Sequence, residues 1–294
     1  MNWRRLQRGV AGLAVAALLA ACTGGGASNV ATGLREVRDI LYAKALVPPA
    51  EDIALDVYAP TGAGPWPLVI YMPGGEQKKD TGITIARKLA ERGTVVLVAD
   101  HYHGASMKDP PLGIASRSLL ELADCALRMA REVGADYGGD PGGLTWTGYS
   151  FGGYIGFEIA LADSDVEQLW DAFVAAHGGP SRVYECVATG EPVPVTALVV
   201  TGAIRFADLW PDAYAADPAV RDFVATTVPI GNPDLVVRMI HGTADEEAPY
   251  ALAERLEAQL TDAGYDAELT TVEGGDHTPN TEVMVATVLE VLGR

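Results

Sequence analysis

The sequence predicts an α/β fold, in which a mostly parallel central sheet carries helices on both of its faces. Three observations predict it. Apolar runs of strand length alternate with segments of helical period along most of the 294 residues. Two of those runs, residues 68–72 and 94–99, are apolar almost throughout, as strands buried on both faces are. The segment Gly148-Tyr149-Ser150-Phe151-Gly152 matches G-x-S-x-G, a pattern that places a serine on a sharp turn between a strand and a helix.

The first 21 residues are expected to be an export signal and not part of the fold. Arg4, Arg5 and Arg8 precede an uncharged run, residues 9–21, that is short for a membrane span. The run leads into Leu-Ala-Ala-Cys, which resembles the lipobox of bacterial lipoproteins. That resemblance implies cleavage before Cys22 and acylation of its thiol, so the protein is expected outside the cytoplasm, anchored to a bacterial membrane. A plain secretory signal and an uncleaved anchor are the alternatives.

Residues 22–34 are predicted to be a flexible tether because they are rich in Gly, Ser, Asn and Thr. Residues 35–294 follow as a single predicted domain without an internal repeat. Its predicted strands are residues 36–42, 53–58, 68–72, 94–99, 143–147, 195–201, 235–240 and 267–272, of which the first two form an antiparallel hairpin. Its predicted helices are residues 81–92, 116–133, 153–161 and 250–263 and a last helix that ends at Leu292.

Three connecting segments are less regular. Residues 137–141 are expected to turn the chain into the strand before Ser150, and Ser116 or Ser118 is expected to cap the helix that precedes that turn. Residues 163–191 have no clear period and residues 206–222 are loop-like. A small cap region is therefore expected around residues 163–233, above the active-site edge of the sheet.

The charge and the cysteines bound the class of protein. A formal net charge of −18 excludes a nucleic-acid role, because a surface this acidic repels a phosphate backbone. Loss of the three arginines with the signal would take the charge to −21. Cys125 and Cys186 then remain, and in an oxidising compartment they could form a disulfide that closes a loop of about 60 residues and contributes about 4 kcal/mol. The sequence does not decide whether the two sulfurs meet.

The order of features from residue 53 to residue 294 resembles the α/β-hydrolase fold. Asp-Ile-Ala-Leu-Asp-Val-Tyr-Ala-Pro at 52–60, followed by Leu-Val-Ile-Tyr-Met-Pro-Gly-Gly at 68–75, resembles the opening of carboxylesterases related to hormone-sensitive lipase and bacterial feruloyl esterases. Those esterases usually read His-Gly-Gly-Gly. Here Pro73 stands at the His position and Glu76 at the third Gly, so the signature is only partly kept. The resemblance implies a serine esterase that acts on small-molecule esters.

The expected catalytic residues are Ser150, Asp245 and His277. A serine hydroxyl needs a base within hydrogen-bond reach and a carboxylate to orient that base, and the family's chain order is Ser, acid, His. His277 follows the last predicted strand in Gly-Gly-Asp-His and fits the base, whereas Asp245 follows the preceding strand and fits the acid. The alternatives for the acid are Glu246, Glu247 and the earlier Asp208.

The oxyanion is expected to accept hydrogen bonds from the backbone N–H of Phe151, which follows the nucleophile, and from the glycine-rich turn at Gly75 and Glu76. The Glu76 carboxylate would disfavour negative charge there unless its side chain points away or pairs with Lys78 or Lys79.

The remaining histidines give weaker signals. His101 and His103 are two residues apart and could face one side of an extended segment, but no third metal ligand is evident, so a loop facing the substrate or a structural role is favoured and no metal is expected. His241 is expected to pack at a strand end.

No dinucleotide fingerprint or P-loop is found in the sequence, so no cofactor is expected. The predicted function is hydrolysis of carboxylic esters, with peptidase, lactone and thioester hydrolysis as alternatives. A catalytically silent surface lipoprotein is the alternative from another class.

Overall fold

The computed structural model describes residues 33–294 apart from 49, 63, 76, 102–112, 162–181 and 206–230. Its strands are β1 (Leu34–Ala45), β2 (Ile53–Pro60), β3 (Trp66–Met72), β4 (Val95–Ala99), β5 (Gly139–Tyr149), β6 (Tyr184–Cys186), β7 (Val195–Thr201), β8 (Val236–Gly242) and β9 (Asp266–Val272). Its helices are α1 (Ile83–Ala90), α2 (Gly113–Asp136), α3 (Phe151–Leu161), α8 (Tyr250–Asp262) and α9 (Thr281–Val291), with the 3₁₀-helix η1 (Lys79–Gly82) before α1.

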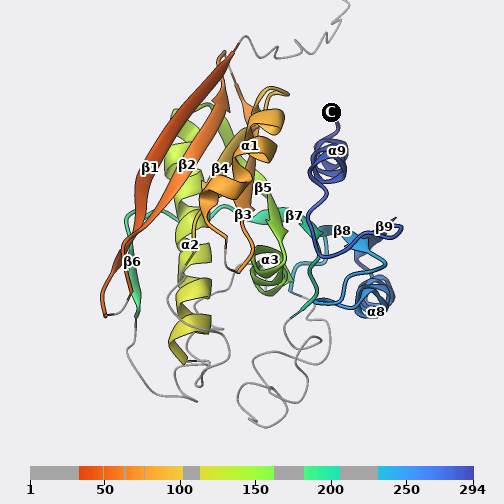
Figure 1. Ribbon diagram of the computed structural model, residues 1–294. Coiled ribbons are helices and arrows are strands. Elements are labelled where there is room, and N and C mark those ends of the chain that lie inside the picture. The colour runs from red at the N-terminus through yellow and green to blue at the C-terminus, as the bar shows by residue number, and fades with distance from the viewer. Residues whose placement is uncertain are drawn as a thin grey trace, which may run out of the picture.

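The strands form one twisted sheet in the order β6-β1-β2-β4-β3-β5-β7-β8-β9 (Figure 1). From β4 to β9 all neighbours run parallel, whereas β2 is antiparallel to β4, β1 to β2 and β6 to β1. The carboxyl ends of the parallel strands therefore lie at one edge, where residues that follow different strands can meet. Strands such as β4 are buried along their whole length, which explains their continuous apolar sequence.

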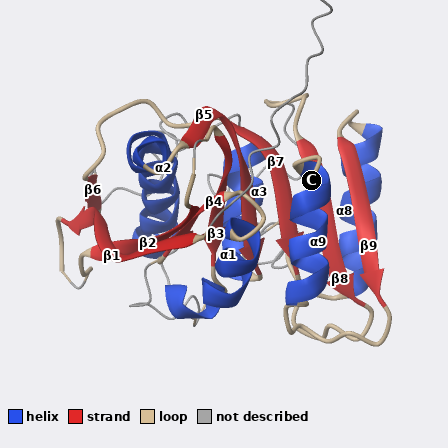
Figure 2. Cartoon of the chain, turned by 90° about the horizontal axis from the view of Figure 1, so that it is seen from above, coloured by secondary structure: helices blue, strands red, loops and turns tan. Residues whose placement is uncertain are grey.

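Helices cover both faces of the sheet (Figure 2). On one face, α1 buries Leu89 next to β2 and β4, and α9 buries Val288 next to β7 and β8, in one shared core. On the other face, α2, α3 and α8 bury residues such as Leu122, Phe157 and Leu256 in a larger core. The sheet and its two helical layers confirm the predicted fold class.

Three predictions along the chain were wrong in detail. The helix α2 begins at Gly113, so Ser116 and Ser118 stand within the helix and not at its cap. The strand β5 begins at Gly139 and takes in most of the predicted turn. Residues 182–205 lie within the predicted cap region, yet they build β6, which was not predicted, and β7, which matches the predicted strand 195–201, in the main sheet. The rest of that region, up to residue 230, lies largely outside the described residues.

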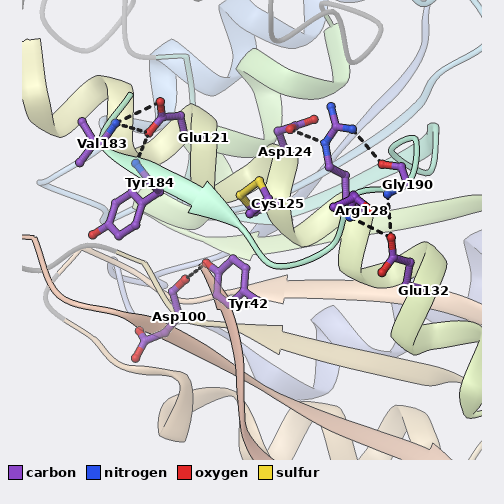
Figure 3. Close-up of a disulfide and its surroundings, with 12 residues drawn as sticks. Tyr42, Asp100, Glu121, Asp124, Cys125, Arg128, Glu132, Val183, Tyr184 and Gly190 are labelled. Carbon is purple, nitrogen blue, oxygen red and sulfur yellow. Dashed lines mark hydrogen bonds and ion pairs between the residues drawn. A yellow bond between two sulfur atoms is a disulfide. The ribbon is translucent and has the colours of Figure 1, made fainter. Parts of the chain in front are cut away.

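The short strand β6 escaped prediction because three residues, Tyr-Glu-Cys, are too few to show a period. It pairs antiparallel with the end of β1 and is joined to α2 by a disulfide between Cys125 and Cys186 (Figure 3). The Cα atoms of the two cysteines are 5.1 Å apart, within the usual range for a disulfide. The two sulfurs whose pairing the sequence left open therefore meet in the structure.

The predicted signal, the tether up to residue 32 and Cys22 lie outside the described residues. Among the helices that are described, none is both long and apolar enough to cross a membrane.

Candidate active site

Ser150 occupies a strained turn between β5 and α3. Its φ of +48° lies in the left-handed region, which a side chain disfavours. The turn also needs small residues around it. A Cβ on Gly148 would lie 2.4 Å from the carbonyl carbon of Gly152, and a Cβ on Gly152 would lie 2.1 Å from the carbonyl oxygen of Met72. The two glycines of the motif therefore allow the backbone to fold tightly enough to present Ser150 beyond the end of the strand.

His277 lies between Ser150 and Asp245. Its Nε2 is 2.9 Å from Ser150 Oγ, and its Nδ1 is 2.8 Å from Asp245 Oδ2. A carboxylate only accepts hydrogen bonds, so Nδ1 carries a proton and Nε2 is the ring nitrogen that faces the hydroxyl of Ser150. The histidine side chain is 11% exposed and the carboxylate is fully buried. The three residues are thus arranged for proton transfer from the serine to the imidazole.

Two loops at the carboxyl edge of the sheet bring the acid and the base together. Asp245 lies in the loop after β8 and His277 in the loop after β9, and the N–H of Ala244 donates to the carbonyl of Gly275 at 2.8 Å. A Cβ on Gly242 would lie 2.2 Å from that same carbonyl oxygen, so glycine is needed where the loops cross.

The carboxylate of Asp245 is held on both of its oxygens. Oδ1 accepts from the backbone N–H groups of Glu247 and Ala248, at 2.9 and 2.8 Å, while Oδ2 faces His277. Of the alternative acids, Glu246 and Glu247 are exposed, and Glu247 approaches His277 at Nε2, 3.7 Å away, on the side of the ring that faces the serine. Asp208 lies outside the described residues. Only Asp245, among the acids described, is placed to orient the imidazole through Nδ1.

His241 is a second histidine on the same carboxylate, a contact that the sequence did not reveal. It is 1% exposed. Its Nε2 is 2.6 Å from the carbonyl oxygen of Ala248 and 3.2 Å from Asp245 Oδ2. Burial lowers the pKa of His241, more than the neighbouring carbonyl and carboxylate raise it, so the ring is held neutral with its proton on Nε2. The spacing of four residues between His241 and Asp245 was the one signal in the sequence.

Tyr154 also reaches the nucleophile, and this contact too was not predicted. It lies one turn along α3, is 4% exposed and forms a side-chain hydrogen bond with Ser150. Burial raises the pKa of the Tyr154 hydroxyl well above its usual range, while the bond to Ser150 lowers it in part. The phenol is therefore uncharged beside the serine and can donate a hydrogen bond.

The expected oxyanion donors Gly75 and Phe151 are neighbours. A Cβ on Gly75 would lie 3.6 Å from Cβ of Phe151, and Gly75 is exposed while Phe151 is buried. The turn closes where the Gln77 N–H donates to the carbonyl of Gly74 at 3.0 Å. Glu76, the other expected donor, lies outside the described residues.

Lys79, one of two cations expected beside Glu76, is engaged elsewhere. Its ammonium lies 2.7 Å from Asp39 Oδ1 and 2.8 Å from Asp56 Oδ1, and Asp56 is completely buried. This pairing raises the pKa of Lys79 against the opposing effect of burial. The lysine therefore fastens η1, just after the glycine-rich turn, to the first two strands.

Of the two histidines weighed as metal ligands, His101 is completely buried and its Nε2 is 3.0 Å from the carbonyl oxygen of Gly74. His103 lies outside the described residues. The Nε2 atom of His101 is thus hydrogen-bonded to the glycine-rich turn.

Comparisons with known proteins place the fold. No family model matches the sequence. The probable isoprenylcysteine alpha-carbonyl methylesterase of Oryza sativa subsp. japonica is 26% identical over 242 residues, which are 76% of this chain and 54% of that protein. The chain thus spans about half the length of this curated relative.

Solved esterase structures match the chain over most of its length. A truncated carbohydrate esterase from gut microbiota has a TM-score of 0.59 at 18% identity, covering 88% of this chain and 97% of that one. Esterase B of Lactobacillus rhamnosis with a tributyrin phosphonate inhibitor scores 0.61 at 17% identity, covering 90% and 85%. Esterase 2 of Thermogutta terrifontis phosphorylated by paraoxon scores 0.58 at 18% identity, covering 89% and 94%. The chain therefore has the α/β-hydrolase fold that the sequence predicted.

Proposed function

We propose that the protein is a serine hydrolase of carboxylic esters. The observation that carries the proposal is the position of His277, whose two ring nitrogens lie 2.9 Å from Ser150 Oγ and 2.8 Å from Asp245 Oδ2. A hydroxyl, a neutral imidazole and a buried carboxylate in this order form the arrangement that activates a serine for acyl transfer.

In the proposed reaction, Ser150 Oγ attacks the ester carbonyl while His277 Nε2 takes its proton. The imidazolium that forms is stabilised by Asp245, which remains ionised. His277 then returns the proton to the alcohol oxygen as the ester bond breaks, leaving an acyl group on Ser150. Water repeats both steps on the acyl-enzyme and restores the serine. The reaction needs only groups of the chain and one water molecule.

The negative charge on the carbonyl oxygen is proposed to be stabilised by the backbone N–H groups of Phe151 and Gly75, with Glu76 as a third candidate. Phe151 begins α3, so its N–H also lies at the positive end of a helix dipole. The nearness of Gly75 to Phe151 supports a shared site for one oxygen atom.

The matched proteins favour esters over other acyl substrates, since they are a probable methylesterase and several esterases. The opening motif supports the same choice and a place among carboxylesterases related to hormone-sensitive lipase. Peptidase, lactone and thioester hydrolysis use the same groups and remain the alternatives. A catalytically silent binding protein is disfavoured, because it would not need the strained backbone of Ser150.

We further propose that the protein acts outside the cytoplasm, tethered through an acylated Cys22. The arginines and uncharged run before the Cys22 motif support export, and the small polar residues that follow it suit a tether. The disulfide between Cys125 and Cys186 fits an oxidising compartment.

A fluorophosphonate probe tests the function. We expect the folded protein to be labelled on Ser150, as identified by mass spectrometry, and to hydrolyse p-nitrophenyl acetate. The Ser150→Ala variant should lose labelling and turnover by a factor on the order of 10⁶, as when other serine nucleophiles are removed. A folded wild-type protein that takes up no label, or a variant that keeps its turnover, would refute the proposal. Faster turnover of p-nitroanilides than of matched p-nitrophenyl esters would favour the peptidase alternative.

A further inference from the structure

His101 is buried next to Phe151 and next to Gly74, the residue before the proposed oxyanion donor Gly75. Its Nε2 lies 3.0 Å from the carbonyl oxygen of Gly74, which directly precedes Gly75, and its ring centroid lies 5.2 Å from that of Phe151 at a tilt of 57°. A carbonyl oxygen only accepts hydrogen bonds, so the Nε2 of His101 must carry a proton and donate it. The triad reaction itself leaves this buried donor without a role.

The bond to Gly74 fixes the direction of the Gly75 N–H. The one cis peptide bond found in the described residues joins Gly64 and Pro65, so the peptide between Gly74 and Gly75 is trans. In a trans peptide the C=O and the N–H lie in one plane and point in opposite directions. A donor that holds the Gly74 carbonyl therefore turns the Gly75 N–H away from the buried His101 ring, and Gly75 itself is exposed.

A second bond completes the hold on this peptide plane. The same Gly74 oxygen accepts from the N–H of Gln77, also at 3.0 Å, across the turn that contains Gly75. With the Gln77 bond alone, the orientation of the peptide plane would depend on a turn whose first two residues are glycines. Glycine has the most backbone freedom of any residue, so the plane could rotate. A donor from outside the turn removes that freedom.

His101 itself is mounted on a rigid part of the sheet. It follows β4, and the residue before it, Asp100, donates its N–H to the carbonyl of Ala54 in β2 at 3.3 Å. The hydroxyl of Tyr42 in β1 donates to the carbonyl of Asp100 (Figure 3), and the carboxylate of Asp100 accepts from the N–H of His101 at 3.1 Å. Strands β1 and β2 thus fix the position of Asp100, and through it the position of His101.

We propose that His101 is a positioning residue for the oxyanion site: by donating to the Gly74 carbonyl and packing on Phe151, it aims the Gly75 N–H at the substrate oxygen. The inference rests on the proposed esterase function. It matters because an oxyanion donor is effective only within about 2.7–3.1 Å of the charged oxygen, and the turn here departs from the usual His-Gly-Gly-Gly at Pro73 and Glu76.

Three substitutions separate the hydrogen bond from the packing. His101→Phe keeps an aromatic ring against Phe151 but has no donor, His101→Asn has a donor too short to reach Gly74, and His101→Gln carries an amide N–H at about the reach of Nε2. Each is assayed on p-nitrophenyl acetate beside the wild type and Ser150→Ala. Inhibition by an aryl trifluoromethyl ketone, which forms a tetrahedral oxyanion on a reactive serine, is measured in parallel.

We expect kcat of His101→Phe and His101→Asn to fall about 10- to 100-fold with KM changed less than about threefold, because loss of one oxyanion donor costs about 10²–10³ and a misaimed donor keeps part of its effect. Inhibition by the trifluoromethyl ketone should weaken by the same factor, and His101→Gln should recover most of both losses. If His101→Phe does not fold, the comparison of Gln with Asn carries the same test.

Two results obtained with the His101 variants would overturn the inference. Wild-type kcat in His101→Phe or His101→Asn would show that the bond does not matter. Equal losses in Phe, Asn and Gln, accompanied by lower unfolding temperatures, would show a role in packing only. If the wild type hydrolyses the ester and only the His101 result fails, the esterase function stands. A wild type without turnover would count against the esterase function and the positioning role together.

Discussion

Asp245 contacts two histidines that differ in exposure and in role. His277 is partly exposed and takes the proton of Ser150 in the proposed reaction, whereas His241 is fully buried and donates from Nε2 to the carbonyl of Ala248. A carboxylate between two imidazoles would be poorly placed to stabilise a cation on one ring if the other ring were also charged, because the two cations would repel each other. The burial of His241 keeps that ring neutral and leaves the charge of Asp245 to His277.

The same burial predicts a pH dependence of stability. The pKa of His241 is lowered in the folded protein by burial, against about 6.5 in the unfolded chain. Between those two pKa values the unfolded chain binds more protons, so the stabilisation is complete above about pH 6.5 and is lost as the pH falls toward the folded pKa. Within the part of the chain that the structure describes, Asp245, His277 and Tyr250 are the titratable groups that face the ring.

We therefore expect the urea midpoint of the wild type to fall more between pH 7.5 and pH 5.5 than that of His241→Gln, which keeps an amide donor for Ala248 but cannot titrate. Carboxylates elsewhere contribute equally to both proteins and cancel in the comparison. Circular dichroism at pH 7.5 checks that the variant is folded. The same fall in midpoint for both proteins would contradict a buried neutral His241.

At the scale of the elements, side chains of α2 form hydrogen bonds with the backbone at the edge strand β6 and in the segment after it. Glu121 accepts from the N–H groups of Val183 and Tyr184, and Glu132 accepts from those of Thr189 and Gly190 (Figure 3). Arg128 and Arg131 donate to the carbonyls of residues 190–192. One helix thus satisfies much of the backbone that a three-residue strand leaves unpaired, and the disulfide between Cys125 and Cys186 adds a covalent link.

Removal of the disulfide is expected to destabilise the protein without unfolding it. The two cysteines are 61 residues apart, and a loop of this length contributes about 4 kcal/mol in the chain-entropy model. The Cys125→Ala/Cys186→Ala variant should melt about 10 °C lower than the wild type, and dithiothreitol should lower the melting temperature of the wild type but not of the variant. An unchanged wild-type melting curve, with two thiols titrated after reduction, would contradict this contribution.

At the scale of the whole molecule, the sequence predicted those features of the fold and of the site that local sequence patterns encode. The fold class follows from apolar runs and helical periods, and the positions of Ser150, Asp245 and His277 follow from a motif and two strand ends that parallel strands bring to one edge. The contact of His101 with Gly74 depends instead on β3 and β4 being neighbours, and no periodicity reports strand order. Strand β6 is too short to show a period. It is stabilised by contacts with α2, and the sequence of β6 itself gives no sign of those contacts.

Anchoring at a membrane would constrain the whole molecule more than any other proposed feature. Each buried CH₂ of an acyl chain contributes about 0.8 kcal/mol, and one chain binds only marginally, so stable anchoring needs more than one chain or a further attraction. A formal charge of −18 supplies no attraction to an anionic bilayer. Retention at the membrane would therefore depend on the acyl groups at Cys22.

Cys22→Ser tests this dependence in a bacterial host that modifies lipoproteins. The wild type should incorporate labelled palmitate and partition into the detergent phase of Triton X-114, whereas Cys22→Ser should do neither and should remain in the aqueous phase. The Cys125→Ser variant is the matched control, because it removes a cysteine outside the lipobox and should keep its label. Palmitate on Cys22→Ser would contradict anchoring through Cys22. A wild type found unlabelled in the aqueous phase would contradict it too, and would leave a plain secretory signal as the explanation of the N-terminal sequence.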